Sequence, residues 1–372
     1  MIYMDHAETT YPHGDVIEAM QPYLETHHRN PSARYASREA AAVADARQSV
    51  AELLGANPEN IVFTGGGSEA DNLALKGVVD AIDGDHVVTT TIEHSAVIET
   101  CNWLEAHDIE VTRVSPGSDG RVDPDDIEDA IRPDTAIVSV MHASNETGVI
   151  QPLEAIGTIT DAHDVVFHSD TVQSAGKIPV SVDDIGLDLA SLSAHKFYGP
   201  NGVGALYVRD GVEIEPLIHG GGQEHGLRSG TENVAGLVGM SKAAELALAD
   251  MEDRRERLTA LRDEFVATVQ ELADAELMGR PKQRLPGYAM LCFPERTSVE
   301  LVDALAERDI AVSGGSACHA GDPSPSRVLV EMGIDPDVAT GAVRFSMGRE
   351  TNQDDVEDLI DALQDILNEI PA

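Results

Sequence analysis

The sequence predicts an α/β protein in which a large domain with a mostly parallel, doubly wound sheet is followed by a smaller α+β domain. Three observations predict this fold class. A chain of 372 residues is longer than one hydrophobic core usually serves, which favours two domains. Residues 60–208 alternate apolar, β-branched runs with helical patterns, as parallel sheets do. Beyond about residue 275, strand and helix patterns follow without that regular alternation.

The expected elements of the large domain follow from the alternation. Strand-like runs and helical patterns take turns along the chain as "IVFTG", "SEADNLALKGVV", "HVVTTT", "SAVIETCNWLEAH", "EVTRVS", "PDDIEDAI", "TAIVSVMHAS", "PLEAIGTITDAH" and "VVFHSD". In such sheets the loops that leave the carboxyl ends of the strands build the ligand crevice. The residues directly after each strand are therefore the first candidates for a functional site.

A long, charge-rich helical stretch from Asn233 to about Ala275 is expected to join the two domains. After it, the small domain is indicated by "GYAMLCF", "SVELVDALAER", "AVRFSMG" and "DDVEDLIDALQDIL", and the N-terminal segment is expected to complete it. We predict a large domain at residues 12–250. The small domain would then comprise residues 1–11 and 251–372 and would carry a loop at about 312–327.

The charge of the chain limits its partners. A formal net charge of −41, from 66 acidic and 25 basic residues, would repel phosphate backbones and anionic membrane surfaces. We therefore expect no direct nucleic-acid partner and no membrane partner. Because 42% of the residues are hydrophobic, the acid is expected on the surface of a packed globule. We interpret this surface as an adaptation to the salty cytosol of a halophilic archaeon.

Cysteine use and the N-terminal residues fit a cytoplasmic protein. Cys101, Cys292 and Cys318 are too few and too scattered for a disulfide framework or a metal quartet. The histidines show no metal-ligand spacing, and no metal site is expected. The start "MIYMDHAETT" resembles no export signal, and no apolar run is long enough to span a membrane.

A glycine-rich turn forms the first candidate site. In "FTGGGSEADN", residues 63–72, a strand ends, three glycines turn, and Ser68 stands where a helix N-cap is expected. The free N–H groups and the positive end of the helix dipole would suit a phosphate. A tight turn with an ordinary serine cap is the simpler alternative, because the pattern fits neither the dinucleotide fingerprint nor the P-loop.

Two further strand ends complete a set. In "HSDTVQ", residues 168–173, Asp170 could pair with a cationic ring nitrogen, although capping the next turn is a common role for such an aspartate. In "SLSAHKFYGP", residues 191–200, Lys196 follows His195 in a chain that uses few lysines. A desolvated lysine beside a cation loses its proton readily and can bond to an aldehyde. A phosphate cup, an aspartate and a lysine together predict a pyridoxal 5′-phosphate (PLP) site.

Cys318 is the candidate nucleophile. It lies in "VSGGSACHAGDPSPSRVL", residues 312–329, a segment whose glycine, serine and proline content predicts a mobile loop. A structural cysteine prefers a packed core, so this position favours a reactive role. Cys101 and Cys292 fall inside apolar helix and strand patterns, where an inert core role is expected.

Along almost its whole length the chain resembles the PLP-dependent cysteine desulfurases of the NifS/IscS type, within the class V aminotransferase group. The matching stretches are "IYMDHAETT", "NPSARY", "VFTGGGSEADNLALKG", "TTIEHSAV", "HASNETGVIQP", "HSDTVQSAGK", "SAHKFYGPNGVGALYVR", "GGGQEHGLRSGTENV", "SGGSACHAGDPSPSRVL" and "VRFSMGR". The resemblance implies a fold-type I PLP-dependent transferase that forms a homodimer.

The resemblance also implies roles for individual residues. Lys196 would hold the cofactor covalently. The phosphate would be bound by Gly67, Ser68, Ser193 and His195, with Thr231 reaching the phosphate of the partner subunit. His94 would stack on the ring, Asp170 would pair with its nitrogen, and Gln173 would contact its hydroxyl. Asn145 and Arg344 would hold the substrate, for which the planar fork of Arg344 suits a carboxylate.

The implied reaction converts L-cysteine to L-alanine. Lys196 would move the α-proton, and the Cys318 thiolate would attack the substrate sulfur and keep it as a persulfide. A sulfur-acceptor protein, such as an iron–sulfur scaffold, or tRNA thiolation would use that sulfur. The alternatives are a selenocysteine lyase, a carbon–sulfur lyase acting on cystine, and a sulfur-carrier scaffold with vestigial catalysis.

Several positions depart from the family pattern. Glu8 stands where the family usually carries a small residue, and Arg29 replaces an expected glycine. These two could form an ion pair, or they could alter the entrance of the site. His319 replaces a small polar residue beside Cys318, and plain exposure is the favoured interpretation.

Overall fold

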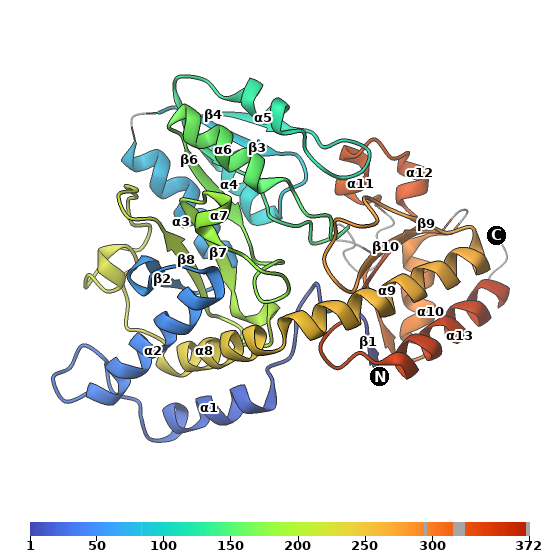
Figure 1. The fold of residues 1–372 in the computed structure, drawn as a ribbon, viewed down its shortest axis with the longest axis horizontal. Coiled ribbons are helices and arrows are strands. Elements are labelled where there is room, and N and C mark those ends of the chain that lie inside the picture. The colour runs from blue at the N-terminus through green and yellow to red at the C-terminus, as the bar shows by residue number, and fades with distance from the viewer. Residues whose placement is uncertain (83, 294–295, 315–323, 370–372) are drawn as a thin grey trace.

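The computed structural model describes residues 1–82, 84–293, 296–314 and 324–369 (Figure 1). Its centre is a seven-stranded sheet in the order β2-β8-β7-β6-β5-β3-β4. The strands are β2 (Ile61–Thr64), β3 (His86–Thr90), β4 (Glu110–Val114), β5 (Thr135–Ser139), β6 (Val166–Asp170), β7 (Leu189–Ser193) and β8 (Gly204–Val208).

The pairing of these strands confirms the predicted fold class. Five adjacent strands run parallel to one another, namely β4, β3, β5, β6 and β7. Strand β8 lies between β7 and β2 and is antiparallel to both. Most of these strands are buried on both faces, as expected for a parallel sheet covered by helices. Parallel strands place their carboxyl ends at one edge of the sheet, where the predicted loops meet.

Helices cover both faces of the sheet. α3 (Gly67–Ala81) and α4 (Ser95–Glu105) pack on one face, over side chains such as Val87 and Ile137. The neighbouring residues Val88 and Val138 point to the other face, as the two-residue period of a strand requires. That second face is covered by α1 (Gly14–Glu25), α2 (Ser37–Leu54), α5 (Pro124–Ala130), α6 (Leu153–His163), α7 (Val182–Ile185) and α8 (Val234–Ala249). Short 3₁₀ turns lie at η1 (Pro58–Asn60), η2 (Ala194–Lys196) and η3 (Glu224–Gly226).

The expected single helical stretch is two helices. α8 ends at Ala249 and α9 (Met251–Ala273) begins after Asp250, whose φ of −123° and ψ of 10° are not helical. α8 packs into the core under the large sheet, whereas α9 packs into a second core. The break at Asp250 therefore lies where the chain passes from one core to the other (Figure 1).

The second core includes side chains from two small sheets. β10 (Tyr288–Cys292) pairs antiparallel with β12 (Ala342–Ser346) and with β9 (Glu276–Leu277). The first residues of the chain also belong here, because β1 (Ile2–Tyr3) pairs in parallel with β11 (Ile310–Ala311). The surrounding helices are α10 (Ser298–Ala306), α11 (Arg327–Glu331), α12 (Pro336–Ala339) and α13 (Gln353–Glu369). The predicted domain boundaries stay a prediction.

Within the described ranges, every helix is too short or too polar to cross a lipid bilayer.

Candidate active site

The carboxyl ends of the strands surround a cavity of about 200 Å³, which brings most of the predicted site residues together. The residues that line it are Glu8, Gly67, Ser68, Asp71, His94, Met141, Ala143, Asn145, Asp170, Val172, Gln173, Ser193, His195 and Lys196. Three predicted residues are not among them. Arg344 lies just behind the wall, Thr231 lies on an exposed loop, and Cys318 falls outside the described residues.

One end of the cavity is built for an anion. α3 begins at Gly67 with Gly66 as its N-cap, so Ser68 is the second residue of the helix and not the predicted cap. A Cβ atom on Gly67 would lie only 2.8 Å from Val172 Cγ2, so glycine lets the helix start approach the neighbouring loop. The start of the helix, with its first N–H groups and the Ser68 hydroxyl, therefore forms part of the cavity wall.

His195 and Ser193 border the same end. Ser193 is the last residue of β7, and His195 follows it in η2. His195 Nδ1 shares a hydrogen bond with Thr9 Oγ1 at 2.9 Å, which leaves the other ring nitrogen for a ligand. Burial, and then the charge of Lys196, lowers the pKa of His195 to about 4, so the imidazole is neutral near pH 7.

Two buried carboxyl groups also line the cavity. Asp170, the last residue of β6, accepts a hydrogen bond from Val172 N at 2.9 Å. Asp71 on α3 is 1% exposed, and its Oδ1 has no hydrogen-bond partner among the described residues. Burial raises the pKa of both groups, and the charge of Asp170 raises that of Asp71 further. One proton between them keeps the pair from carrying two buried charges.

His94 faces this pair from the start of α4. Its Nδ1 accepts a hydrogen bond from Ala96 N at 3.1 Å, which makes it the N-cap of the helix. Nitrogen and oxygen atoms of His94, Asp71 and Asp170 lie within 4.8 Å of one another. Sequence reasoning missed Asp71, although its position four residues after Gly67 places both on one face of α3 and could have revealed it.

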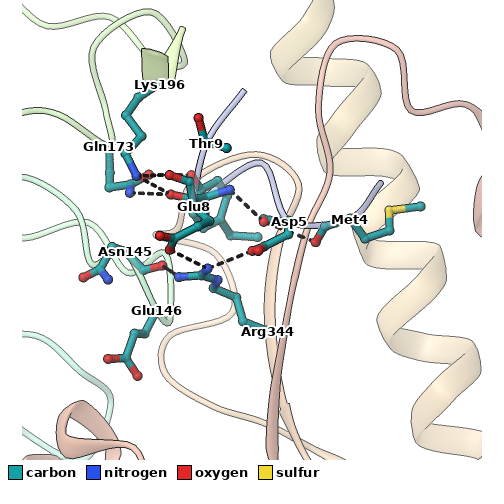
Figure 2. Close-up of polar contacts among 12 residues, drawn as sticks. Met4, Asp5, Glu8, Thr9, Asn145, Glu146, Gln173, Lys196 and Arg344 are labelled. Carbon is teal, nitrogen blue, oxygen red and sulfur yellow. Dashed lines mark hydrogen bonds and ion pairs between the residues drawn. The ribbon is translucent and has the colours of Figure 1, made fainter. Parts of the chain in front are cut away.

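Lys196 enters the cavity from η2 (Figure 2). Its Nζ donates hydrogen bonds to Ala7 O at 2.8 Å and to Glu8 O at 2.5 Å. Burial lowers the pKa of Lys196 to about 8, Glu8 opposes this shift, and Arg344 adds to it. The predicted neighbouring cation is therefore Arg344 and not His195, whose ring is neutral.

Gln173 is fixed by two partners. Its Nε2 donates to Ala7 O at 2.9 Å, and its Oε1 accepts from the hydroxyl of Tyr288 at 2.7 Å. These bonds set the orientation of the amide, with the NH₂ group on the side of the N-terminal segment. Tyr288 comes from β10 of the second core, and no local signal in the sequence links it to Gln173.

Arg344, from β12, is 1% exposed and closes the far side of the site (Figure 2). Its Nη2 donates to Asp5 Oδ1 at 2.8 Å, and its Nη1 donates to Asn145 O at 2.9 Å. Glu8 Oε2 lies 3.6 Å from the same Nη2. Glu8 thus contacts Arg344, and the ion pair suggested with Arg29 is not among those of the described residues.

The segment that carries Cys318 is anchored at both described ends. Before it, Ser313 and Arg344 exchange backbone hydrogen bonds of 3.2 and 2.6 Å. After it, the Ser326 hydroxyl donates to Glu146 Oε2 at 2.5 Å, and Arg327 donates to Glu93 O at 2.6 Å. Both anchors lie next to the site residues of the cavity.

The residues present fit PLP. The helix start at Gly67 and Ser68 offers donors to a phosphate, as do Ser193 and His195. Asp170 offers a carboxylate to a ring nitrogen, and a lysine with a lowered pKa points into the same cavity.

Comparison with known proteins points to one family. The profile described as "Aminotransferase class-V" matches residues 2–359. A "Cysteine desulfurase IscS" from Dictyoglomus turgidum is 42% identical over 99% of this chain and 95% of its own length. One from Methanosarcina thermophila is 41% identical over 99% of this chain and 92% of its own.

Solved structures give the same result. A "NifS-like protein" superimposes with a TM-score of 0.94 at 35% identity, over 99% of this chain and all of the other. A structure titled "SspA in complex with cysteine" gives a TM-score of 0.83 at 37% identity, over 93% of this chain and 99% of that one.

Proposed function

Because the chain belongs to the class V aminotransferase family, we propose that it is a PLP-dependent cysteine desulfurase that converts L-cysteine to L-alanine. One observation carries the proposal most directly. A lysine amine with a pKa of about 8 shares a single cavity with a helix start suited to phosphate and with buried Asp170. PLP, when bound, draws electrons away from the α-carbon of an amino acid and so makes its proton removable.

The residues of the chain divide the work. Gly67, Ser68, Ser193 and His195 would hold the phosphate, and Asp170 would keep the ring nitrogen protonated. Arg344 would bind the carboxylate of the substrate beside Asn145. Gln173, held by Tyr288 and by Ala7 O, would contact the ring hydroxyl through the second N–H of its amide.

Lys196 is suited to carry the α-proton. A pKa of about 8 means that a substantial fraction of the amine is neutral near physiological pH and able to accept a proton. The carbonyl oxygens of Ala7 and Glu8 fix its Nζ in the cavity. His94 flanks the site at the start of α4 and would cover one face of the ring.

Cys318 would take the sulfur. Its thiolate attacks the sulfur of the substrate, an S–S bond forms, and the C–S bond breaks. The carbon fragment takes up a proton and leaves as L-alanine, and the sulfur stays on the enzyme as a persulfide. A second thiol, on an acceptor protein, can then receive it, and we propose an iron–sulfur scaffold or a tRNA-thiolation protein as that acceptor.

The test is a mass measurement on the intact chain after incubation with L-cysteine. One added sulfur atom on the peptide that carries Cys318 is expected, together with release of alanine. Cys101 and Cys292 are internal controls, because burial raises the pKa of each to about 12 and suppresses the thiolate. A Cys318→Ala protein should still show the visible absorption of the cofactor but release no sulfide; normal desulfuration by this variant would refute the role.

Selenocysteine and cystine are the alternative substrates on the same fold. Turnover of cysteine, selenocysteine and cystine measured side by side separates the three activities. A scaffold with vestigial catalysis would turn over none of them, even with the cofactor bound.

We further propose that the active unit is a homodimer. Thr231, the expected contact to the partner's phosphate, is exposed and is not among the residues that line the cavity of its own chain. Exposed apolar side chains also gather near the start of the chain, with Ile17 at 55%, Leu24 at 68% and Tyr35 at 74% exposure. Sedimentation of the cofactor-loaded protein tests this, and a monomer with full activity would exclude it.

The surroundings that we propose are the cytoplasm of a halophilic archaeon. The support is the net charge of −41 and the absence of a disulfide framework among three cysteines.

A further inference from the structure

Arg344 is held in place by hydrogen bonds, but these bonds use only some of the N–H donors of its guanidinium. One N–H of Nη2 is taken by Asp5 at 2.8 Å, and one N–H of Nη1 is taken by the carbonyl of Asn145 at 2.9 Å. Each terminal nitrogen of a guanidinium carries a second N–H. The buried Nε makes no hydrogen bond within the described part of the chain. The arginine therefore keeps donors for a carboxylate, in a position set by its other partners.

Glu8 stands beside these donors. Its Oε2 lies 3.6 Å from Arg344 Nη2, which is close enough for an ion pair but too long for a direct hydrogen bond. The Glu8 side chain is 71% exposed, whereas that of Arg344 is 1% exposed. Glu8 lines the cavity and Arg344 does not. The glutamate carboxylate thus lies at the cavity wall through which a ligand would reach the guanidinium.

The backbone of Glu8 cannot move away easily, but its side chain can. The Glu8 carbonyl accepts a hydrogen bond from Lys196 at 2.5 Å, and the next residue, Thr9, bonds to His195 at 2.9 Å. These contacts hold the backbone at the mouth of the site. The Glu8 carboxylate is itself exposed to water and makes no direct hydrogen bond to Arg344, so rotation of this carboxylate into solvent is a small cost.

We propose that Glu8 is a specificity-determining residue, an internal carboxylate that competes with the carboxylate of the substrate for Arg344. The inference rests on the proposed function in one respect, because it takes Arg344 as the receptor of that carboxylate. Two carboxylates cannot share the remaining donors without repulsion, so a ligand with a carboxylate must displace Glu8. A ligand that lacks a carboxylate leaves Glu8 in place.

The competition depends on salt. Glu8 faces solvent, so its attraction to Arg344 and its repulsion of an incoming anion are screened as ionic strength rises. The Asp5–Arg344 pair is more buried, with a direct hydrogen bond, and keeps the guanidinium in place. Glu8 therefore weakens the binding of carboxylates in dilute buffer, and this effect becomes smaller at high salt.

The experiment measures binding of two probes to the cofactor-loaded protein by titration calorimetry. 3-Mercaptopropionate has the thiol and the carboxylate but no amine, and cysteamine has the thiol and the amine but no carboxylate. Glu8→Gln removes the charge and keeps the shape, and Glu8→Ala removes both. Glu110→Gln is the matched control, because Glu110 is also 71% exposed and paired with an arginine, on the edge strand β4.

Glu8→Gln and Glu8→Ala should bind 3-mercaptopropionate about two- to fivefold more tightly than the wild-type protein at low salt, the range expected for loss of an exposed ion pair. The KM for L-cysteine should fall in parallel, and the difference from wild type should shrink in molar salt. Binding of cysteamine should not improve in either variant, and Glu110→Gln should behave as wild type.

Two results would overturn the inference. Unchanged or weaker binding of 3-mercaptopropionate in both variants would show that Glu8 does not compete for Arg344. Weaker binding of cysteamine in both variants, without tighter binding of 3-mercaptopropionate, would show that Glu8 instead recruits the substrate ammonium. Failure of the proposed function is distinguishable, because it would abolish sulfide release by the wild-type protein while the two binding measurements still compare the variants.

Discussion

At the scale of single residues, Lys196 shows how burial changes the chemistry of a side chain. Its ammonium form is disfavoured mainly because the residue is desolvated, and Glu8 only partly restores it. A lysine in solution would bond to an aldehyde efficiently only at much higher pH. Attachment of the cofactor at Lys196, as proposed, would therefore be a reaction of near-neutral pH.

The rate of attachment should reveal this pKa. When PLP is added to the cofactor-free protein, the growth rate of the visible absorption should rise about tenfold per pH unit below pH 8 and level off above it. The sign follows from the lowered pKa, because the reactive neutral amine accumulates as pH rises through about 8. Glu8→Gln should move the bend to lower pH, because Glu8 raises this pKa. A rise that continues towards pH 10 would contradict the assignment.

Much of the candidate site could be predicted from the sequence. The apolar strand patterns show where the strands end, and therefore which residues lie near the ligand-binding edge of the sheet. Asp170 and Lys196 were found in this way. Asp71, Asp5 and Tyr288 were not, because each acts through a neighbour that is distant in sequence or lies on another element. Cys318 lies outside the described residues, so its place relative to the cavity stays a prediction.

At the scale of elements, the loop that carries Thr231 is fastened by a buried ion pair. Glu224 accepts two hydrogen bonds of 2.8 Å from Arg47 on α2 and a third, also of 2.8 Å, from Phe63 N in β2. The Glu224 side chain is 3% exposed. Its φ of 48° is unusual for a residue other than glycine, which indicates that these contacts determine the local backbone.

Glu224→Gln should destabilise the protein by about 3 kcal/mol, because it leaves the largely buried Arg47 guanidinium without a counter-charge. Urea unfolding measures the change. Glu110→Gln is the surface control and should cost less than about 1 kcal/mol. Equal effects of the two substitutions would mean that the Glu224–Arg47 pair does not fasten the loop.

The strands of the large sheet were predictable, and the break between α8 and α9 was not. Strands such as β5 are buried throughout and rich in β-branched residues, so their composition alone indicates them. The stretch around Asp250 contains no glycine or proline. Its break coincides with ion pairs from Arg254 and Arg349, the second of which comes from beyond β12. The long-range contact from Arg349 leaves no signal in the sequence around Asp250.

At the scale of the whole molecule, the candidate site combines residues from the large sheet with residues from the small sheets. Arg344 on β12 and Tyr288 on β10 hydrogen-bond to Asn145 and Gln173 in the cavity wall, and the ends of the large-sheet strands supply other lining residues. The N-terminal segment contacts both regions, because β1 pairs with β11 while Ala7 and Glu8 accept hydrogen bonds from Lys196. Alternation of elements predicted the layers, but it could not predict how two cores meet.

The net charge of −41 should make stability depend strongly on salt. With 66 acidic against 25 basic residues, most surface carboxylates have no cation to pair with, and their mutual repulsion favours the expanded, unfolded chain. Screening shortens that repulsion to a few ångströms in molar salt. The midpoint of thermal unfolding should therefore rise steadily from dilute buffer to molar potassium chloride. Sucrose of equal osmolality is the control, since it stabilises by exclusion without screening charge. A midpoint that responds equally to sucrose and to salt, or to neither, would remove the physical basis for a high-salt cytosol.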